Sequence, residues 1–241
     1  MNVLLLGGTG GIGKLALRRL LEQGHTVTAM VRHTTDLPVH EQLERVQTTL
    51  LECSETWLEE RLGKVDAVIS CLGHRPTFSG LFGNPRRLVH DSLNRVLRVL
   101  ARQPRRPVKI ILLGSSGCVN SLRKERLPAP DRLVLTLIRH LVPPHADNEQ
   151  AAELLASQRR HNPFLEWVVV RPDSLINAEN ASPYEARVSP ARSPIFNSGE
   201  TSRINVAHFL EALLSDASLW AQWRHEMPVL YNKSPVSDSS N

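Results

Sequence analysis

The sequence predicts an α/β fold, a doubly wound and mostly parallel sheet within a single domain. Helical and strand-like patterns alternate along most of its 241 residues. The strand-like segments are apolar almost throughout, which is typical of strands that helices cover on both faces. No stretch with the composition of a linker divides the chain. We therefore expect one domain over residues 1–233, followed by a small, polar and flexible tail over 234–241.

The N-terminal half supplies four predicted strands and three helices. Apolar runs that end at glycine or at a polar turn predict the strands, and apolar residues three or four positions apart predict the helices. The expected strands lie at residues 2–6, 26–31, 46–51 and 66–72. The expected helices lie at residues 15–23, 55–62 and 86–102.

The C-terminal half repeats the alternation and adds a long loop. The expected strands lie at residues 108–113, 165–170 and 229–231, and the expected helices at 148–160 and 205–215. Residues 179–201 are rich in Pro, Ser, Asn and Gly and come after the carboxyl end of a strand. Ligands bind at that end of such sheets, so this segment is expected to form a substrate lid. An ordinary surface loop is the alternative.

The glycines after the first predicted strand are the most informative local feature. Gly7, Gly10 and Gly13 stand between an apolar run and an amphipathic helix. Glycines in such a turn let a pyrophosphate approach bare backbone, and the helix N-terminus offers it unpaired N–H groups. This order predicts a bound dinucleotide, with a turn that binds no ligand as the alternative. The residues expected to hold the pyrophosphate are Gly7, Thr9, Gly10, Gly11, Ile12 and Gly13.

The residue after the second predicted strand selects between the two nicotinamide coenzymes. An acidic side chain there binds a ribose 2′-hydroxyl, whereas an arginine suits a 2′-phosphate. The chain has Arg32 at this place, and the nearest acid is Asp36. Because the guanidinium fork matches phosphate geometry, we expect NADP(H) as the cofactor. A solvated charge at a strand end is the alternative role of Arg32.

Composition and charge argue against several classes of partner. Part of the net charge of +5 lies in a basic cluster at residues 98–109, which suits a helix C-terminus better than nucleic acid. No apolar run reaches transmembrane length and no basic leader is present, so we expect no membrane and a cytoplasmic location. The three cysteines have neither disulfide nor metal-ligand spacing, so we expect no metal site.

Several motifs together resemble a known superfamily. Beyond the glycines they are Val31-Arg32, Ser115-Ser116, Trp167 to Pro172 and Arg203 to Ala207. Over most of residues 1–213 the chain resembles the short-chain dehydrogenase/reductases, and more narrowly their atypical NAD(P)H-binding branch, which includes NmrA-like proteins. The segment 24–32 is especially similar to the flavin reductase/biliverdin reductase B type. The resemblance implies a Rossmann sheet and an NAD(P)H cofactor.

The resemblance also implies where the rest of the coenzyme lies. Leu72 and Gly73 are expected to flank the groove on its adenosine side. Ser115 or Ser116, together with the segment from Pro172 to Ser174, is expected to face the nicotinamide. A serine hydroxyl at that place can donate to a carbonyl or hold a water, unless the pair merely forms a serine-rich turn.

Typical members of the superfamily use a Tyr-x-x-x-Lys pair for proton transfer, and this chain lacks one. Its two tyrosines are Tyr184 and Tyr231, and the residues four positions later are valine and proline. An alcohol dehydrogenase mechanism is therefore not supported. The flavin and biliverdin reductases of the resembling type also lack this pair and mainly stack and orient a flat acceptor.

A dense polar group at residues 145–149 permits two interpretations. Asp147 or Asn148 caps the following helix, with Glu149 favoured by the positive helix end. Alternatively the group lines the active pocket, with His145 as a proton donor and Glu149 tuning it. His74 and the loop to residue 85 also border the expected cleft, where a solvated histidine is the alternative.

These observations lead to two function hypotheses. The first is an NADPH-dependent oxidoreductase that transfers hydride to a planar conjugated acceptor, such as a flavin, a quinone or a conjugated carbonyl, with Ser116, Ser115 and His145 as catalytic residues. The second is a non-catalytic NADP(H)-binding redox sensor or regulatory protein of the NmrA-like type. Either way we expect a small-molecule ligand, no nucleic acid and no membrane, and a monomer or homodimer.

Overall fold

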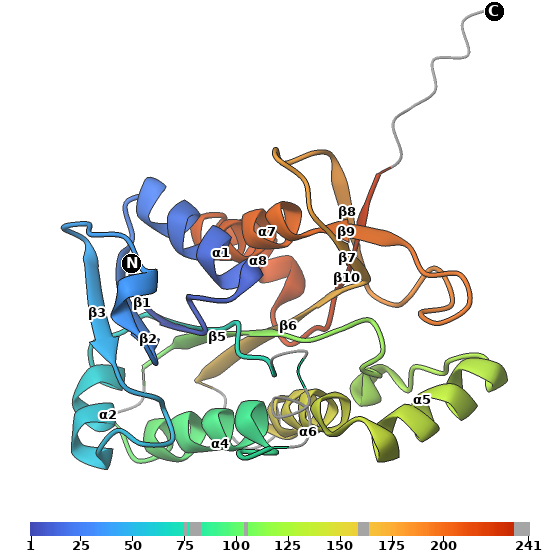
Figure 1. Cartoon of the computed structure of the whole chain (residues 1–241), viewed down its shortest axis with the longest axis horizontal. Helices are drawn as coiled ribbons and strands as arrows, with labels where there is room; N and C mark the ends of the chain where they lie inside the picture. The colour runs from blue at the N-terminus through green and yellow to red at the C-terminus, as the bar shows by residue number, and fades with distance from the viewer. Residues whose placement is uncertain (75–76, 78–82, 104–105, 159–163, 234–241) are drawn as a thin grey trace, which may run out of the picture.

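A computed structural model describes residues 1–74, 77, 83–103, 106–158 and 164–233, and one large sheet runs through them (Figure 1). Its strands, in spatial order, are β3 (Leu43–Gln47), β2 (Thr26–Val31), β1 (Asn2–Leu6), β4 (Ala67–Ser70), β5 (Val108–Leu113), β6 (Leu165–Pro172), β10 (Val229–Asn232) and β8 (Tyr184–Arg187). Neighbouring strands from β3 to β10 are parallel, and β8 is antiparallel to β10. The order 3-2-1-4-5-6 is that of the Rossmann fold, which confirms the predicted fold class.

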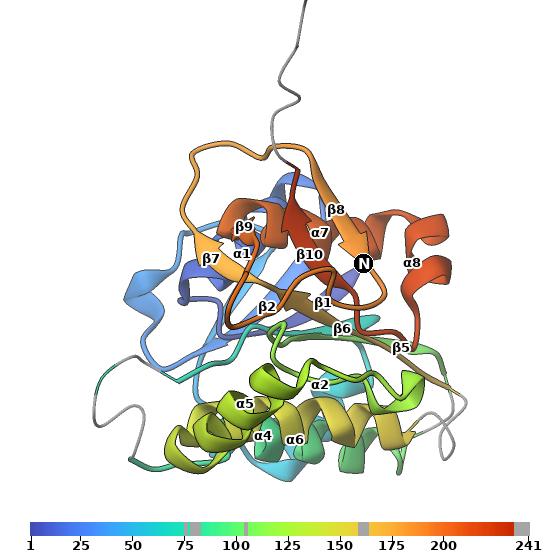
Figure 2. The ribbon, with the colours of Figure 1, turned by 90° about the vertical axis from the view of Figure 1, so that its right-hand side faces the viewer.

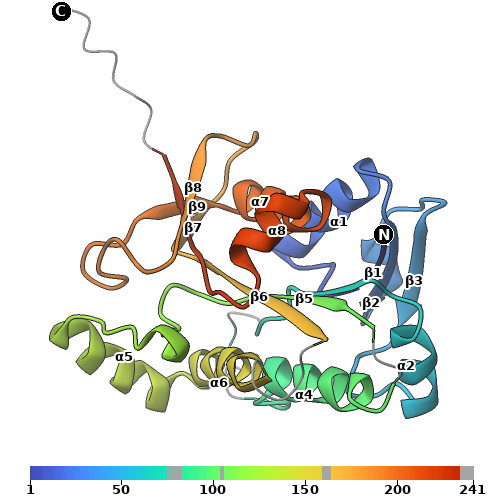
Figure 3. The same cartoon turned by 180° about the vertical axis from the view of Figure 1, so that it is seen from behind.

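Helices cover both faces of this sheet (Figures 1 and 3). One face carries α1 (Gly11–Glu22), α7 (Arg203–Ser215) and α8 (Ala217–Trp223). The other carries α2 (Glu55–Leu62), α4 (Leu88–Leu100) and α6 (Pro143–Gln158), and α5 (Ala129–Leu141) extends that layer beyond the sheet. The short elements are the 3-10 turns η1 (Thr34–Asp36) and η2 (Ser121–Arg123) and a two-stranded sheet of β7 (Ser174–Ile176) and β9 (Glu200–Ser202).

Side-chain alternation along β1 explains the two hydrophobic cores. Val3 and Leu5 pack in the core beneath α1 and α7, whereas Leu4 and Leu6 pack in the core beneath α2, α4 and α6. All four side chains are buried, because successive residues of a strand point to opposite faces and both faces are covered. A continuous apolar run is therefore the expected sequence of this strand.

Several element boundaries differ from the sequence prediction; the helix expected at 15–23, for example, lies at Gly11–Glu22. The helix expected at 148–160 begins at Pro143, because proline is well tolerated in the first turn of a helix and Pro143-Pro144 opens α6. The weak third strand lies at Leu43–Gln47 and not at 46–51. Helices α5 and α8 and the strands β7, β8 and β9 were not predicted.

The predicted lid segment, residues 179–201, contains β8 and is attached at further points. The Ser193 hydroxyl donates to Asp131 Oδ1 at 2.5 Å, at the start of α5. The Ala191 N–H donates to the Tyr231 hydroxyl on β10 at 3.1 Å. Figure 2 shows β8 beside β10 at this end of the sheet. The expected tail at 234–241 lies outside the described residues.

None of the helices in the described part of the chain combines the length and the apolar character needed to cross a membrane.

Candidate functional site

The carboxyl ends of four neighbouring strands bring most of the predicted site residues to one edge of the sheet. Because β1, β4, β5 and β6 are adjacent and parallel, the segments that follow them emerge side by side. These segments are the glycine turn, the loop at Leu72 to His74, the serine pair and the residues after Pro172. The site expected from scattered motifs is thus spatially continuous along this edge.

Two glycines of the turn are required by the protein's own packing. Gly7 has a φ of +78°, and a Cβ there would lie 2.5 Å from the Cys71 carbonyl oxygen at the end of β4. A Cβ on Gly13 would clash with the Gly7 carbonyl oxygen. The turn is closed by the Gly10 N–H, which donates to that same oxygen at 3.0 Å. These contacts let α1 start directly against the end of β1.

The N-terminus of α1 fits a phosphate group. Its N-cap residue is Gly10, which has no side chain to cap the free amides, and its first turn contains no acidic residue. Gly10 and Gly11 are exposed, Thr9 is half-buried, and Ile12 and Gly13 pack inward. Free N–H donors and a positive dipole end therefore face an open surface, which is the arrangement that binds phosphates.

Arg32 lies directly after β2 and is exposed. The nearest acid, Asp36, is in the η1 turn and is exposed as well. The strand β2 is next to β1 in the sheet. Arg32, which follows β2, and the glycine turn, which follows β1, therefore start from neighbouring strand ends. This is the position from which such a side chain reaches the adenosine ribose in dinucleotide-binding sheets.

The loop after β4 is linked to α6 through a buried carboxylate. Leu72 is half-buried and Gly73 exposed, and His74 Nε2 lies 2.9 Å from Asp147 Oδ2. The two oxygens of Asp147 accept the N–H groups of Val89 and His90 at 2.8 and 2.9 Å. Asp147 thus caps α4, not its own helix, and the expectation that it begins a helix at this place is wrong because α6 starts earlier.

Ser116 and Asp173 form a buried polar pair where β5 and β6 end. The Ser116 hydroxyl donates to Asp173 Oδ1 at 3.0 Å, and the Gly199 N–H donates to Asp173 Oδ2 at 2.9 Å. Burial raises the pKa of Asp173 above its ordinary value of 3.8, although these hydrogen bonds lower it. Ser115 is half-buried, and its hydroxyl is 3.8 Å from Cys118 Sγ.

The sequence analysis placed Asp173 within the segment Pro172 to Ser174 that is expected at the nicotinamide, but it assigned this carboxylate no role of its own. The Pro172 carbonyl accepts the Ser116 N–H at 3.0 Å, and Ser174 is exposed at the start of β7. An acid directly after a strand-ending proline was the available signal. Its burial could not be anticipated, because it depends on Gly199 from a distant loop.

His145 packs against the serine turn. Its Cε1 atom would lie 2.9 Å from a Cβ on Gly117, so the imidazole contacts that backbone directly. Its Nε2 atom is 3.7 Å from Glu149 Oε1 and, within the described structure, is buried without a hydrogen-bond partner. Burial lowers the pKa of His145, and the nearby Glu149 carboxylate opposes that shift. One turn along the same helix, Asn148 Oδ1 is also buried and unpaired.

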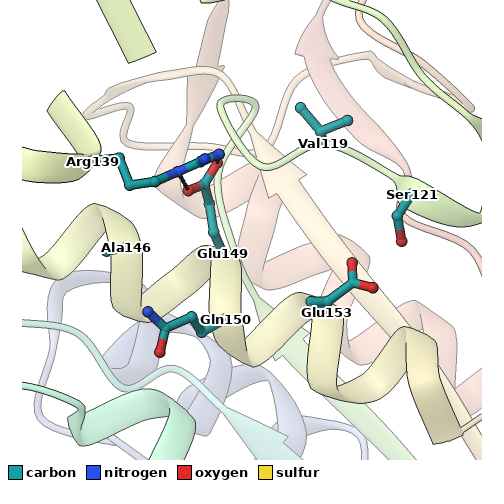
Figure 4. Close-up of a pocket in the computed structure, with 7 residues that line it drawn as sticks. All are labelled: Val119, Ser121, Arg139, Ala146, Glu149, Gln150 and Glu153. Carbon is teal, nitrogen blue, oxygen red and sulfur yellow. Dashed lines mark hydrogen bonds and ion pairs between the residues drawn. The ribbon is translucent and has the colours of Figure 1, made fainter. Parts of the chain in front are cut away.

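A pocket of about 330 Å³ opens between α6, α5 and the segment after β5 (Figure 4). Its lining residues are Val119, Ser121, Arg139, Ala146, Glu149, Gln150 and Glu153. Arg139 donates to both oxygens of Glu149, at 2.6 and 2.9 Å. This ion pair joins α5 to α6 at the wall of the pocket.

Both tyrosines are on strands at the far end of the sheet. The Tyr184 hydroxyl is 2.8 Å from His208 Nδ1, and the Tyr231 hydroxyl accepts the Ala191 N–H. Burial raises the pKa of Tyr184 to about 12. The three cysteine thiols are buried, and no group of His, Cys, Asp and Glu in the described residues has the arrangement of a metal site.

Sequence comparison identifies the family. The sequence model of a family described as NAD(P)H-binding matches residues 7–217. One curated relative, a probable pinoresinol-lariciresinol reductase of Arabidopsis thaliana, is 38% identical over 74 residues. That match spans 30% of this chain and 24% of the relative's length.

Solved structures share the fold over nearly the whole chain. A candidate NADH-flavin reductase of Streptococcus pneumoniae has a TM-score of 0.68 at 19% identity and covers 97% of this chain and 100% of its own. A short-chain dehydrogenase/reductase of Veillonella parvula in complex with NADP has a TM-score of 0.69 at 16% identity. The match covers 97% of this chain and 95% of the other. An anaerobillin reductase of Escherichia coli O157:H7 has a TM-score of 0.68 at 16% identity. The match covers 98% of this chain and 100% of the other.

At these identities the solved structures establish the fold, whereas the family model covers most of the chain, including the glycine turn and α7. The resemblance expected from the motifs is thereby confirmed, together with a nicotinamide dinucleotide as the ligand. The chain belongs to the NAD(P)H-binding family.

Proposed function

We propose that this protein is an NADPH-dependent oxidoreductase whose acceptor is a planar conjugated molecule, such as a flavin, a quinone or a conjugated carbonyl. The observation that carries the proposal is the polar cluster of Ser116, Asp173 and His145, at the same sheet edge as the glycine turn. A coenzyme on that turn would extend along this edge toward the cluster. The reductase activities named for the solved structures of similar fold support the same class.

In this proposal the chain's own residues bind, orient and protonate, while the reduced nicotinamide supplies the hydride. Gly7 to Gly13 hold the pyrophosphate, and Leu72 and Gly73 flank the adenosine side. Pro172 and Ser174 border the nicotinamide. The choice of NADPH over NADH is assigned to Arg32. This residue is exposed, so its guanidinium is open to a 2′-phosphate.

Proton supply is assigned to the two sides of the cluster. While Asp173 is ionised, the Ser116 hydroxyl points its hydrogen at that carboxylate and can only accept from a ligand. Protonation of Asp173 releases the hydroxyl to donate toward an acceptor oxygen or nitrogen. On the other side, Nε2 of His145 is buried without a hydrogen-bond partner among the described residues, and this imidazole is assigned as the second proton donor. Ser115 is in the same turn, and its hydroxyl lies near Gly117, as the His145 ring does.

The residues of 179–201 are proposed to cover the acceptor as part of the single domain over 1–233. Gly199 contributes directly, because its N–H donates to the Asp173 carboxylate. The attachment of Ser193 to Asp131 and of Ala191 to Tyr231 holds the remainder against α5 and β10. The cover would therefore be shaped before the acceptor binds.

A second candidate function is an NADP(H)-binding redox sensor without turnover. It is favoured by the lack of a Tyr-x-x-x-Lys pair and by the hydrogen bond that commits the Tyr184 hydroxyl to His208. In that case the coenzyme would stabilise a surface that a partner binds.

The test follows NADPH oxidation by absorbance with FMN and a panel of small quinones, alongside NADPH binding by fluorescence. We expect turnover with at least one acceptor. Ser116→Ala should lower kcat by roughly tenfold to a hundredfold with little change in NADPH affinity. The matched control is Ser157→Ala, which removes an exposed hydroxyl of α6 that bonds only to its own helix. Tight NADPH binding without turnover of any acceptor would exclude the oxidoreductase and leave the sensor.

A further inference from the structure

Arg203, the first residue of α7, lies over the glycine turn. A Cβ on Gly11 would be 3.5 Å from both Cδ and Nε of this arginine. Gly11 is in turn the first residue of α1. The Arg203 side chain therefore lies beside the first residue of the helix to which the pyrophosphate is assigned, although it is about 190 residues away along the chain.

The electrostatics of this place are unfavourable without an anion. The helices α1 and α7 pack side by side, and their N-termini meet where Arg203 contacts Gly11 (Figures 1 and 3). Each N-terminus carries partial positive charge, and neither first turn contains an acidic residue. A cation in the first turn of a helix further destabilises that helix, so a role in stability does not explain Arg203.

The hydrogen bonding of Arg203 leaves its charge uncompensated by the described residues. Nη1 donates to Asn177 Oδ1 at 2.8 Å, and this partner is neutral. The ion pairs found in the described part of the chain do not include Arg203, whereas Arg19, two turns along α1, pairs with Glu211. Of the five N–H donors of a guanidinium, several remain for a ligand.

The backbone that carries Arg203 is held rigidly. Ser202 caps α7 by accepting the Asn205 N–H at 3.2 Å, and the Ser202 N–H donates to Asn232 Oδ1 at 3.0 Å. Ser202 and Asn205 are fully buried. A side chain that starts from such a fixed point and is tethered by Asn177 loses little freedom when a ligand binds.

We propose that Arg203 binds the coenzyme pyrophosphate from the side opposite the α1 amides, so that the phosphates are held between two helix N-termini and a guanidinium. This inference rests on the coenzyme of the proposed function but not on any acceptor. It assigns different phosphates to the two arginines: Arg203 binds the pyrophosphate that NADPH and NADH share, and Arg32 binds the 2′-phosphate that NADPH alone carries.

The experiment measures the affinities of NADPH, NADH and adenosine 2′-monophosphate by calorimetry, for the full chain and three variants. Arg203→Gln should weaken NADPH and NADH by the same factor, roughly tenfold to a hundredfold, and leave adenosine 2′-monophosphate unchanged, because that probe has no pyrophosphate. Arg203→Lys should lose less, since the point charge remains. The matched control is Arg18→Gln, which removes an exposed charge from the same helix α1 and should change none of the three affinities.

Several outcomes would overturn the inference. Unchanged affinities in Arg203→Gln, loss of NADPH without loss of NADH, or an equal loss in Arg18→Gln would each exclude a pyrophosphate contact. Circular dichroism and the melting temperature show whether Arg203→Gln keeps its fold. If it does not, the coenzyme affinities of Arg203→Lys are compared with those of the unaltered chain instead. Failure of the unaltered chain to bind either coenzyme would overturn this inference and the proposed function together. Normal binding without turnover would overturn only the oxidoreductase.

Discussion

At the scale of single residues, glycines of one motif serve different physical purposes. Gly7 and Gly13 are required because a Cβ would meet backbone carbonyls of β4 and of the turn. Gly10 and Gly11 are exposed, and a Cβ on either would make at most a close contact. The first two therefore specify the path of the chain, whereas the second two keep the surface of the turn open to a ligand.

The proposed role of Arg32 predicts a selective loss of NADPH affinity. Arg32→Gln removes the cation assigned to the 2′-phosphate, so NADPH should bind roughly tenfold to a hundredfold more weakly while NADH is unaffected. Fluorescence titration of both coenzymes measures this. The neighbouring His33→Gln is the control and should leave the ratio unchanged. Equal loss of both coenzymes in Arg32→Gln would remove this role from Arg32.

The raised pKa of Asp173 predicts a pH-dependent stability. Its folded-state pKa is above the ordinary 3.8, so the folded protein holds this proton more tightly than the unfolded chain does. That contribution is complete below the unfolded pKa and is lost as the pH rises through the folded pKa. Asp173→Asn removes it, and the amide can still accept from Gly199 and donate to Ser116.

We therefore expect the free energy of unfolding of the wild type, minus that of Asp173→Asn, to decrease as the pH rises from about 4 to 7, by at most about 1.4 kcal/mol per pH unit. Urea unfolding at several pH values measures it. Ser174→Ala, which alters the exposed neighbour without removing a titratable group, should keep the wild-type dependence. A difference that increases with pH would contradict the assignment.

At the scale of elements, buried polar side chains join the ends of segments that also pack in the hydrophobic cores. Asp147 on α6 caps α4 and pairs with His74 after β4. Arg171, fully buried in β6, donates to Glu125 at 2.8 Å, to the Cys118 carbonyl at 2.6 Å and to the Met227 carbonyl at 2.6 Å. Each such group stabilises the ends of several elements at once, because its hydrogen bonds leave no buried donor unmatched.

Removal of the Asp147 carboxylate should therefore destabilise the fold. Asp147→Ala leaves the N–H groups of Val89 and His90 without their acceptor, and we expect the free energy of unfolding to fall by roughly 1–3 kcal/mol. Chemical denaturation measures the change. Glu153→Ala, at an exposed position of the same helix, should change it by no more than about 0.5 kcal/mol. Equal effects of the two substitutions would show that the α4 cap contributes nothing.

At the scale of the whole molecule, the parallel sheet collects the site at one edge, and the coenzyme would bridge its two halves. Residues before β4 supply the glycine turn and Arg32, and residues after it supply the serine pair and Asp173. A ligand that contacts both halves binds only the folded chain and stabilises it by mass action.

NADPH should accordingly raise the melting temperature in a concentration-dependent way. At a hundred times its Kd it should add about 2.7 kcal/mol to the free energy of unfolding, and NADH at the same concentration should add less. Differential scanning fluorimetry across a dilution series of each coenzyme measures this. AMP, which lacks the nicotinamide half, is the control and should add least to the free energy of unfolding. No shift with either coenzyme would contradict dinucleotide binding by this chain.

Much of the strand–helix order was predictable, because burial on both faces makes each parallel strand a continuous apolar run and each covering helix amphipathic. The 55–62 helix and the 26–31 and 108–113 strands were predicted with the bounds observed. The small strands were not predicted, because pairing with distant segments stabilises them: β8 pairs with β10, and β7 with β9.

The sequence by itself determined the fold class, the glycine turn and the coenzyme family, because these depend on local spacing and on periodic burial. Only the tertiary structure decided that Asp173 is buried against Ser116, that Asp147 caps α4, and that Arg203 lies over Gly11. Each of these contacts joins residues that are more than 50 positions apart. Hydrogen-bond partners and electric fields depend on distance in space, and a linear sequence does not state that distance.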